Sequence, residues 1–379
     1  MSYFVTNFMY QSTFIIMGLA GLAFLIAFHE LGHFLFCKLF NIYTPSFSIG
    51  FGPVLFARKI GTTLFKLSLI PLGGYVEIAG SEEIGQGEQL YGNVKDETSF
   101  ATKPFWQKFL VMIGGILFNL IFAYTAFIIT FWIGAPRSQL LYPTITTPTV
   151  VEVVVDSPAA AIIKPDDIIL SINGELLGNS TAIYMKRINT PVDDPIQLTF
   201  KRDNQEITTT LTPVIQTNKG ITTASLGIIF EMKESAPMSF KAAFLTGIQE
   251  THRWIGNIWR DFCYLLSEKK FGKMAGPLMI IHTSAQLAGK GFLLFLLFLA
   301  IISINLAILN LIPIPILDGG QIVFHAIEAI FGKPLPERAQ YFIHMACWLS
   351  FMALFIFLSW QDIVRILTPL LIQLNLVNN

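Results

Sequence analysis

Apolar residues dominate four long stretches of the chain, and segments rich in polar residues and glycine separate them. A helix of about 20 apolar residues is long enough to cross a bilayer. The four stretches cover Thr13–Phe36, Phe109–Ile133, Phe292–Ile316 and Tyr341–Trp360. The pattern therefore predicts a polytopic α-helical membrane protein with about four transmembrane helices.

Positive charges are distributed unevenly around these stretches. No Lys or Arg precedes Lys38, whereas seven lie between the first two stretches: Lys38, Arg58, Lys59, Lys66, Lys95, Lys103 and Lys108. Cytoplasmic loops carry an excess of Lys and Arg. We therefore expect the N-terminus and the polar stretch after the second helix to lie outside the cytoplasm.

Two regions between the predicted helices have different patterns. The segments Phe47–Pro53 and Lys66–Val76 predict short, apolar strands that form a membrane-associated β-hairpin element. The outer region alternates β-branched and polar residues, as in a small α+β domain. We expect four parts: an N-terminal membrane part (1–136), this domain (137–236), an amphipathic helix region (237–288) and a C-terminal membrane part (289–379).

Composition narrows the class of protein. Of 379 residues, 53% are hydrophobic and 13% are charged, and the mean hydropathy is +0.60. Soluble domains carry nearer a quarter charged residues, so lipid is expected to be part of this chain's solvent. The formal net charge is zero, which gives no reason to expect a nucleic-acid partner.

The end of the first predicted helix carries the motif His29-Glu30-Leu31-Gly32-His33. Residues i and i+4 share one face of a helix, so both imidazoles can reach one zinc ion. Glu30 is then placed to take a proton from water as a general base. A polar helix end in contact with lipid headgroups is the alternative, but ionisable residues at membrane depth are costly and usually functional.

A catalytic zinc needs a third protein ligand, and Asp318 has the best sequence context. It follows two prolines at the end of the third apolar stretch, and the predicted topology puts that end at the depth of His29 and His33. His325 and His344 are the other nearby candidates, and a helix-end turn in water is the alternative reading of Asp318. In the second helix, Gly114–Asn119 provides glycines for helix packing and an amide for hydrogen bonding, and Asn119 is a candidate for site support.

These motifs together resemble the site-2 protease family of intramembrane zinc metalloproteases, in particular its bacterial regulator-of-sigma-E protease type. The similarity extends over nearly the whole chain. It rests on His29–His33 and on segments in the same order as in the family: Gly50–Pro53, Pro71–Tyr75, Gly114–Asn119, Gly276-Pro277 and Asn310–Gly320. The outer domain resembles a PDZ domain.

The resemblance implies Glu30 as catalytic base and a zinc ion held by His29, His33 and Asp318. It implies a multi-pass protein of the bacterial inner membrane, with the PDZ-like domain outside and the active site toward the cytoplasm. Substrates are then single-span membrane proteins already trimmed by another protease, such as anti-sigma factors, or remnant signal peptides.

The resemblance also assigns substrate-binding segments. A strand at Gly73, Gly74 and Tyr75 holds the substrate as an added strand, and Asn310 with Pro313 and Pro315 clamps it from the other side. Only one PDZ-like domain fits between Arg137 and Ser239, whereas the best-known members of this type have two. Whether this domain binds a peptide or acts sterically stays open.

Two other functions use the same residues. A metal transporter would need several charges along a path, whereas the charged residues here gather at one predicted depth. An inactive scaffold would not need Glu30. The sequence therefore favours the protease.

Overall fold

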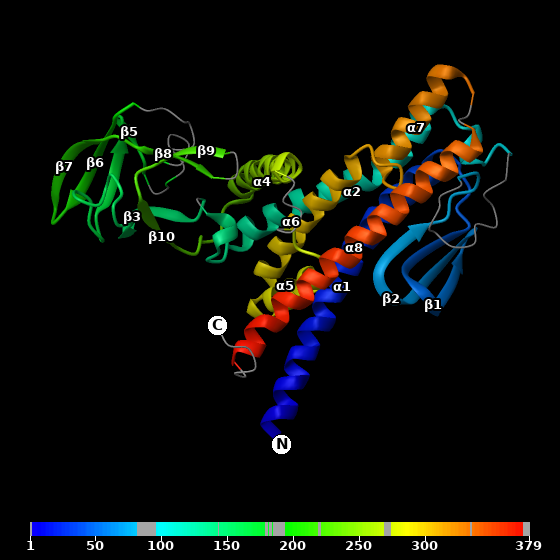
Figure 1. Cartoon of the computed structure of the whole chain (residues 1–379), viewed down its shortest axis with the longest axis horizontal. Coiled ribbons are helices and arrows are strands. Elements are labelled where there is room, and N and C mark those ends of the chain that lie inside the picture. Colours follow the sequence, from blue (N-terminus) through cyan, green and yellow to red (C-terminus); the bar gives the residue numbers. More distant parts are fainter. Residues whose placement is uncertain are drawn as a thin grey trace. The chain divides into compact units, whose positions relative to one another are not determined.

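The computed structural model describes residues 2–81, 96–142, 144–178, 181, 184, 194–218, 221–268, 274–333 and 336–373 (Figure 1). The chain divides into two compact units. One contains Met1–Phe127, Thr251–Trp259 and Lys269–Asn379, and the other contains Ile128–Glu250 and Arg260–Glu268. All residues of the predicted metal site belong to the first unit.

Four of the described helices are long and apolar enough to cross a membrane. They are α1 (Ser2–Leu39), α2 (Phe105–Ile133), α6 (Phe292–Leu311) and α8 (Glu337–Gln373). They lie where the apolar stretches predict spans, and the chain is accordingly a polytopic helical membrane protein.

The third span is shorter than predicted. The apolar run continues to Ile316, but α6 ends at Leu311 and Ile312 is extended, with φ −68° and ψ 139°. Proline disfavours a helical conformation in the residue before it and has no N–H to donate, so Pro313 ends the helix. Asp318 therefore does not close the third span. It begins a separate helix, α7 (Asp318–Phe331).

Most of one further helix falls within the expected amphipathic helix region (237–288), but it was not predicted as a separate helix. Helix α5 (Pro277–Lys290) begins with a proline at its first position, where no N–H is needed. It packs on α1, where the buried Ser284 hydroxyl donates to the Gly18 carbonyl at 3.3 Å. Gly291 then separates α5 from α6.

The predicted β-hairpin element is present but longer than its two short predicted segments. It consists of β1 (Ser46–Ile60) and β2 (Thr63–Val76), which pair with each other. Figure 1 shows both strands in blue. Exposed apolar side chains occupy the outer part of β1: Val54, Leu55, Phe56 and Ile60.

The register of the β1–β2 pair leaves one edge of β2 without a strand partner among the described residues. The first residues of β1, Ser46–Ile49, lie between Leu64–Leu67 and Gly74–Val76 of β2. Within the described part of the chain, Gly74–Val76 has a strand partner on only this one edge. Its other edge is therefore available for a further strand.

The second unit holds the predicted PDZ-like domain. One sheet has the order β10-β3-β4-β6-β7, with β5 paired to β4, and β8 and β9 pair separately. The strands are β3 (Thr146–Val153), β4 (Ile168–Ile172), β5 (Glu175–Leu176), β6 (Ile196–Arg202), β7 (Gln205–Leu211), β8 (Val214–Asn218), β9 (Ile221–Ser225) and β10 (Ile228–Met232). Apolar side chains including Ile169, Leu198 and Phe200 form its core.

Two tight turns join neighbouring strands of this domain. Asn173 and Gly174 join β4 to β5, and Asp203 and Asn204 join β6 to β7. All four have positive φ values, which these residue types tolerate. The predicted amphipathic helix is present as α4 (Phe240–Glu268), and short 3₁₀ helices occupy Phe100–Thr102 and Gln139–Leu141.

A buried ion pair ties β6 to the start of β4. Arg202 donates through Nε and Nη2 to the Asp167 carboxylate, at 2.8 and 2.6 Å. Burial alone would raise the pKa of Asp167, but the hydrogen bonds from Arg202 and from the Lys164 N–H outweigh burial and hold that pKa below its ordinary value. The pair therefore stabilises the domain at neutral pH, and this contribution is lost as the pH falls through the lowered pKa.

Helix α8 is tied to α5 through Asp362, whose side chain is fully buried. Its carboxylate accepts hydrogen bonds from the N–H groups of Gly276, at 3.0 Å, and Met279, at 2.9 Å. We expect Asp362→Ala to destabilise the protein by about 2–3 kcal/mol, because both donors of this helix start lose their acceptor. Thermal unfolding in detergent measures the effect.

The matched variant for this prediction is Asp362→Asn. It keeps one acceptor oxygen, so its unfolding midpoint is expected between those of Asp362→Ala and wild type. An Asp362→Ala protein that unfolds at the wild-type temperature would contradict the tie between α5 and α8.

Candidate metal centre

The two motif histidines lie on one face of α1. The Nε2 atoms of His29 and His33 are 3.2 Å apart. The His33 Nδ1–H donates to the Val111 carbonyl on α2 at 2.8 Å. A carbonyl only accepts, so this bond places the proton on Nδ1 and leaves the His33 Nε2 lone pair free for a metal.

Asn119 on α2 contacts the other histidine. Its side-chain Nδ2 is 3.1 Å from His29 Nδ1, and the buried Ser303 hydroxyl on α6 donates to the main-chain carbonyl of Asn119 at 2.8 Å. A histidine that binds metal through Nε2 carries its proton on Nδ1, and the Asn119 amide accepts from that N–H when it is turned over so that its oxygen takes the place of Nδ2. The structure thus gives Asn119 an orienting contact with His29, one of the two roles the sequence left open for it.

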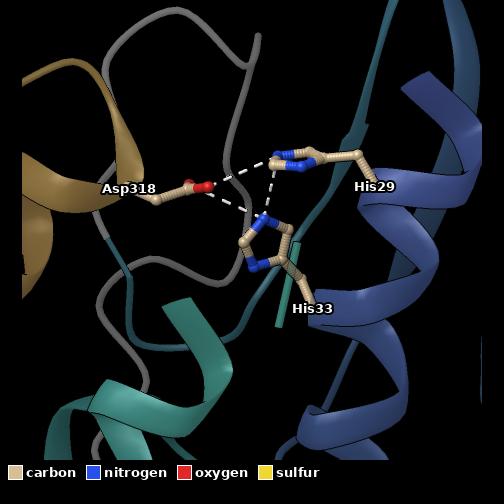
Figure 2. Close-up of side chains that lie close together, drawn as sticks. All are labelled: His29, His33 and Asp318. Carbon is tan, nitrogen blue, oxygen red and sulfur yellow. Dashed lines mark hydrogen bonds and ion pairs between the residues drawn. The ribbon is translucent and has the colours of Figure 1, made fainter. Parts of the chain in front are cut away.

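Asp318 completes the cluster from the first residue of α7. Its Oδ2 lies 3.4 Å from His29 Nε2, and its Oδ1 lies 3.6 Å from His33 Nε2. Figure 2 shows the two rings of α1 and this carboxylate pointing toward one another. Oδ2 is buried and has no hydrogen-bond partner among the described residues. A buried oxygen of this kind is costly unless something else binds it.

The separations of these atoms fit a zinc ion. Zinc–ligand bonds of 2.0–2.1 Å at tetrahedral angles place ligand atoms about 3.3 Å apart. The three observed separations are 3.2, 3.4 and 3.6 Å. In the part of the chain that the structure describes, the candidate metal cluster consists of His29, His33 and Asp318. Two imidazoles and one carboxylate leave a fourth position open.

The alternative histidine ligands lie elsewhere. His325 Nδ1 is 3.3 Å from Glu328 on the same helix, and its ring contacts Phe100. His344 Nε2 is hydrogen-bonded to Gln321. Neither belongs to the cluster, so the structure favours Asp318 among the candidates for the third position.

The cluster opens into a cavity of about 420 Å³. Of the predicted catalytic and substrate-binding residues, Glu30, Gly73, Gly74 and Asn310 line it. Tyr75, Pro313 and Pro315 are not among its lining residues. The sequence had singled out none of the apolar side chains that complete its wall: Ile26, Val76, Ile78, Met112, Leu306, Ile316, Leu317 and Phe351.

The β2 edge lies directly against Glu30. A Cβ placed on Gly74 would be 2.9 Å from the Ser48 carbonyl oxygen on β1, and it would be 3.2 Å from Ile26 Cγ2 and 3.5 Å from Glu30 Cγ on α1. The absence of a side chain at Gly74 therefore lets the strand approach α1 closely. This contact puts the unpaired edge of β2 and the candidate base at the same cavity.

Gly115 makes room for the two imidazoles. A Cβ on Gly115 would overlap the rings of His29 and His33. We expect Gly115→Ala to lower zinc affinity about 10- to 100-fold, since overpacking a filled site costs roughly 1–3 kcal/mol. Competition with a chromogenic chelator measures the affinity.

Gly289→Ala is the control for this substitution. Its added Cβ would lie 3.5 Å from Phe14, an ordinary contact on a helix outside the site. The prediction is wrong if Gly115→Ala binds zinc as tightly as Gly289→Ala does.

Comparison with known proteins matches the chain to one peptidase family. The family model for peptidase family M50 matches residues 17–354. Zinc metalloprotease RasP of Geobacillus kaustophilus is 28% identical over 90% of this chain and 95% of its own length. A putative zinc metalloprotease of Nostoc sp. is 31% identical, covering 94% of this chain and 97% of the relative.

One further relative matches most of the chain, and one solved structure matches a small part of it. A putative zinc metalloprotease of Campylobacter jejuni is 30% identical over 91% of this chain and 92% of the relative. The PDZ domain of the SdrC-like protein from Listeria monocytogenes is 23% identical over 22% of this chain and 84% of that chain, with a TM-score of 0.20.

Proposed function

The chain belongs to peptidase family M50, the site-2 protease family, and is a zinc metalloprotease. We propose that it hydrolyses peptide bonds within the transmembrane segments of single-span membrane proteins. One observation carries the proposal. The residues of the metal cluster and their orienting contacts come from three candidate membrane spans and from the first residue of α7. A substrate that reaches them must enter between helices that lie in the bilayer.

In this proposal His29, His33 and Asp318 hold the zinc ion. Bound there, zinc supplies Lewis-acid chemistry that activates water and polarises a carbonyl oxygen. Glu30 accepts the proton of the attacking water and passes it to the leaving amine. Val111 and Asn119 fix the orientation of the two imidazoles through their hydrogen bonds.

The cavity walls suggest how a substrate is held. Gly73 and Gly74 line the cavity from β2, and Asn310 lines it from the end of α6. A helical substrate hides its peptide bonds, whereas a strand added to the β2 edge exposes them. We therefore assign substrate binding to Gly73, Gly74 and Tyr75, and to Asn310 with the turn that Pro313 and Pro315 create.

Location and substrate class complete the proposal. The protein lies in the bacterial inner membrane, with the metal site toward the cytoplasm and the N-terminus and predicted PDZ-like domain outside. The exposed apolar tip of β1 suits contact with lipid. Suitable substrates are trimmed single-span proteins, such as anti-sigma factors, or remnant signal peptides. The predicted PDZ-like domain controls their access, by peptide binding or by a steric role.

The experiment compares a membrane-embedded substrate with a soluble one. Proteoliposomes containing the protein receive a trimmed single-span protein, and a parallel sample receives a soluble, unfolded polypeptide that carries the same residues broken up by charged ones. We expect cleavage of the membrane substrate only, abolished by a zinc chelator. Equal cleavage of both forms would identify a general metallopeptidase instead.

Cross-linking tests the proposed strand addition separately. In a variant without its own cysteines, Tyr75→Cys is expected to form a disulfide with a cysteine beside the substrate's scissile bond. Leu55→Cys, at the exposed far end of the hairpin element, is the control. Equal cross-linking at both positions would rule out a substrate strand on this edge.

A further inference from the structure

A network of hydrogen bonds connects α8 to the turn that precedes Asp318. His344 on α8 is buried, with 5% of its surface exposed. Its Nε2 lies 3.0 Å from Gln321 Nε2 on α7, and Gln321 Nε2 lies 2.8 Å from the Pro315 carbonyl. His344 Nδ1 lies 2.9 Å from the Gln340 carbonyl.

Each polar hydrogen in this hydrogen-bond network has a defined acceptor. The Gln340 carbonyl only accepts, so the proton of a neutral His344 is on Nδ1. His344 Nε2 is then an acceptor and takes one hydrogen of the Gln321 amide. The other hydrogen of that amide goes to the Pro315 carbonyl. The two bonds use both donors of Gln321 and fix its orientation.

The turn before Asp318 needs such support. Pro313 and Pro315 have no N–H, which removes two backbone donors from the segment between α6 and α7. Leu317, at the N-cap of α7, makes no side-chain capping hydrogen bond. The Gln321 amide thus fastens the Pro315 carbonyl to the first turn of α7, three residues beyond Asp318.

We infer that His344 is a positioning residue that holds Asp318 toward His29 and His33, acting through Gln321 and the Pro315 carbonyl. This inference rests on the proposed role of Asp318 as a zinc ligand. His344 itself stays outside the metal cluster. Without its acceptor, Gln321 is free to turn away from Pro315, and the Asp318 carboxylate loses its fixed direction.

Two substitutions of His344 in the intact protein test the inference. His344→Leu removes the acceptor, whereas His344→Gln keeps an oxygen that can accept from Gln321. Mutation of a residue that supports a metal ligand typically lowers metal affinity or activity about 10- to 100-fold. We expect His344→Leu to lower zinc affinity and kcat about tenfold with little change in KM, and to alter the visible absorption of the cobalt-loaded protein. His344→Gln restores most of each.

The control is another histidine hydrogen-bonded to a glutamine, outside the site. His282 Nε2 lies 2.9 Å from Gln286 Nε2 on the exposed face of α5, and His282→Leu is expected to behave as wild type. Combining His344→Leu with Gln321→Leu is expected to cost no more than Gln321→Leu alone, because both act on one path. The path would be excluded if the two losses multiplied.

The remaining outcomes separate this inference from the proposed function. Asp318→Ala in the same assays reports on the ligand itself. Suppose that Asp318→Ala loses zinc. If His344→Leu then matches wild type in zinc affinity and cobalt spectrum, the positioning role is wrong and the proposed site stands. The same conclusion follows if His344→Gln is as impaired as His344→Leu. If Asp318→Ala keeps wild-type zinc affinity, the proposed ligand set fails.

Discussion

The Glu30→Gln protein is expected to keep its zinc and to hydrolyse a single-span substrate about 10³-fold more slowly than wild type. A positioned general base contributes roughly 10²- to 10⁴-fold, and an amide cannot take the proton. Glu30 follows the first histidine of the cluster on α1 and lines the cavity beside it. The measurement combines zinc content by mass spectrometry with the single-turnover cleavage rate in detergent.

Glu77→Gln is the matched control for this variant. Glu77 is also a buried glutamate, and it accepts a hydrogen bond from Ser46 at 2.8 Å. Its two neighbours, Val76 and Ile78, line the cavity. We expect its replacement to leave the cleavage rate near that of wild type. A Glu30→Gln protein that cleaves as fast as Glu77→Gln would remove Glu30 from the reaction.

Asp318→Ala is expected to lower zinc affinity by more than about 100-fold and to abolish hydrolysis. The loss exceeds what a supporting partner costs, because one of three direct ligands is removed. The Oδ1 and Oδ2 atoms each lie within 3.6 Å of a histidine Nε2, so no other described side chain replaces them without rearrangement. Chelator competition and zinc content after dialysis measure the affinity.

Asp261→Ala serves as the control for Asp318→Ala, since Asp261 is exposed on α4. Circular dichroism and gel filtration in detergent verify that both variants are folded. Zinc retained by a folded Asp318→Ala protein at wild-type affinity would show that the third ligand is another group.

Much of this architecture is visible in the sequence because hydrophobic length is a strong signal. Four apolar runs predicted four spans, and the spacing of His29 and His33 predicted a metal site on one helix face. Asp318 was reached by reasoning about topology, since spacing alone does not connect it to residues nearly 290 positions earlier. The structure brings these three residues together.

The features that the sequence did not predict depend on tertiary contacts, which no sequence pattern shows. Helix α7 was missed because the apolar run continues through the prolines to Ile316, which hid the break between α6 and α7. The full length of the β1–β2 pair was missed because residues 54–60 of β1 do not alternate between apolar and polar side chains, so the period of a half-buried strand is absent from the sequence. Met112 and Phe351 reach the cavity only through the packing of α2 and α8, so a single sequence gives no sign of them.

The position of the cut in a membrane substrate tests the central claim most directly. A single-span protein is incubated with the enzyme in proteoliposomes, and mass spectrometry of both fragments locates the broken peptide bond. The account predicts a cut within the apolar segment, made by wild type and absent with Glu30→Gln. A cut confined to residues outside the segment, or the same cut made by Glu30→Gln, would contradict it.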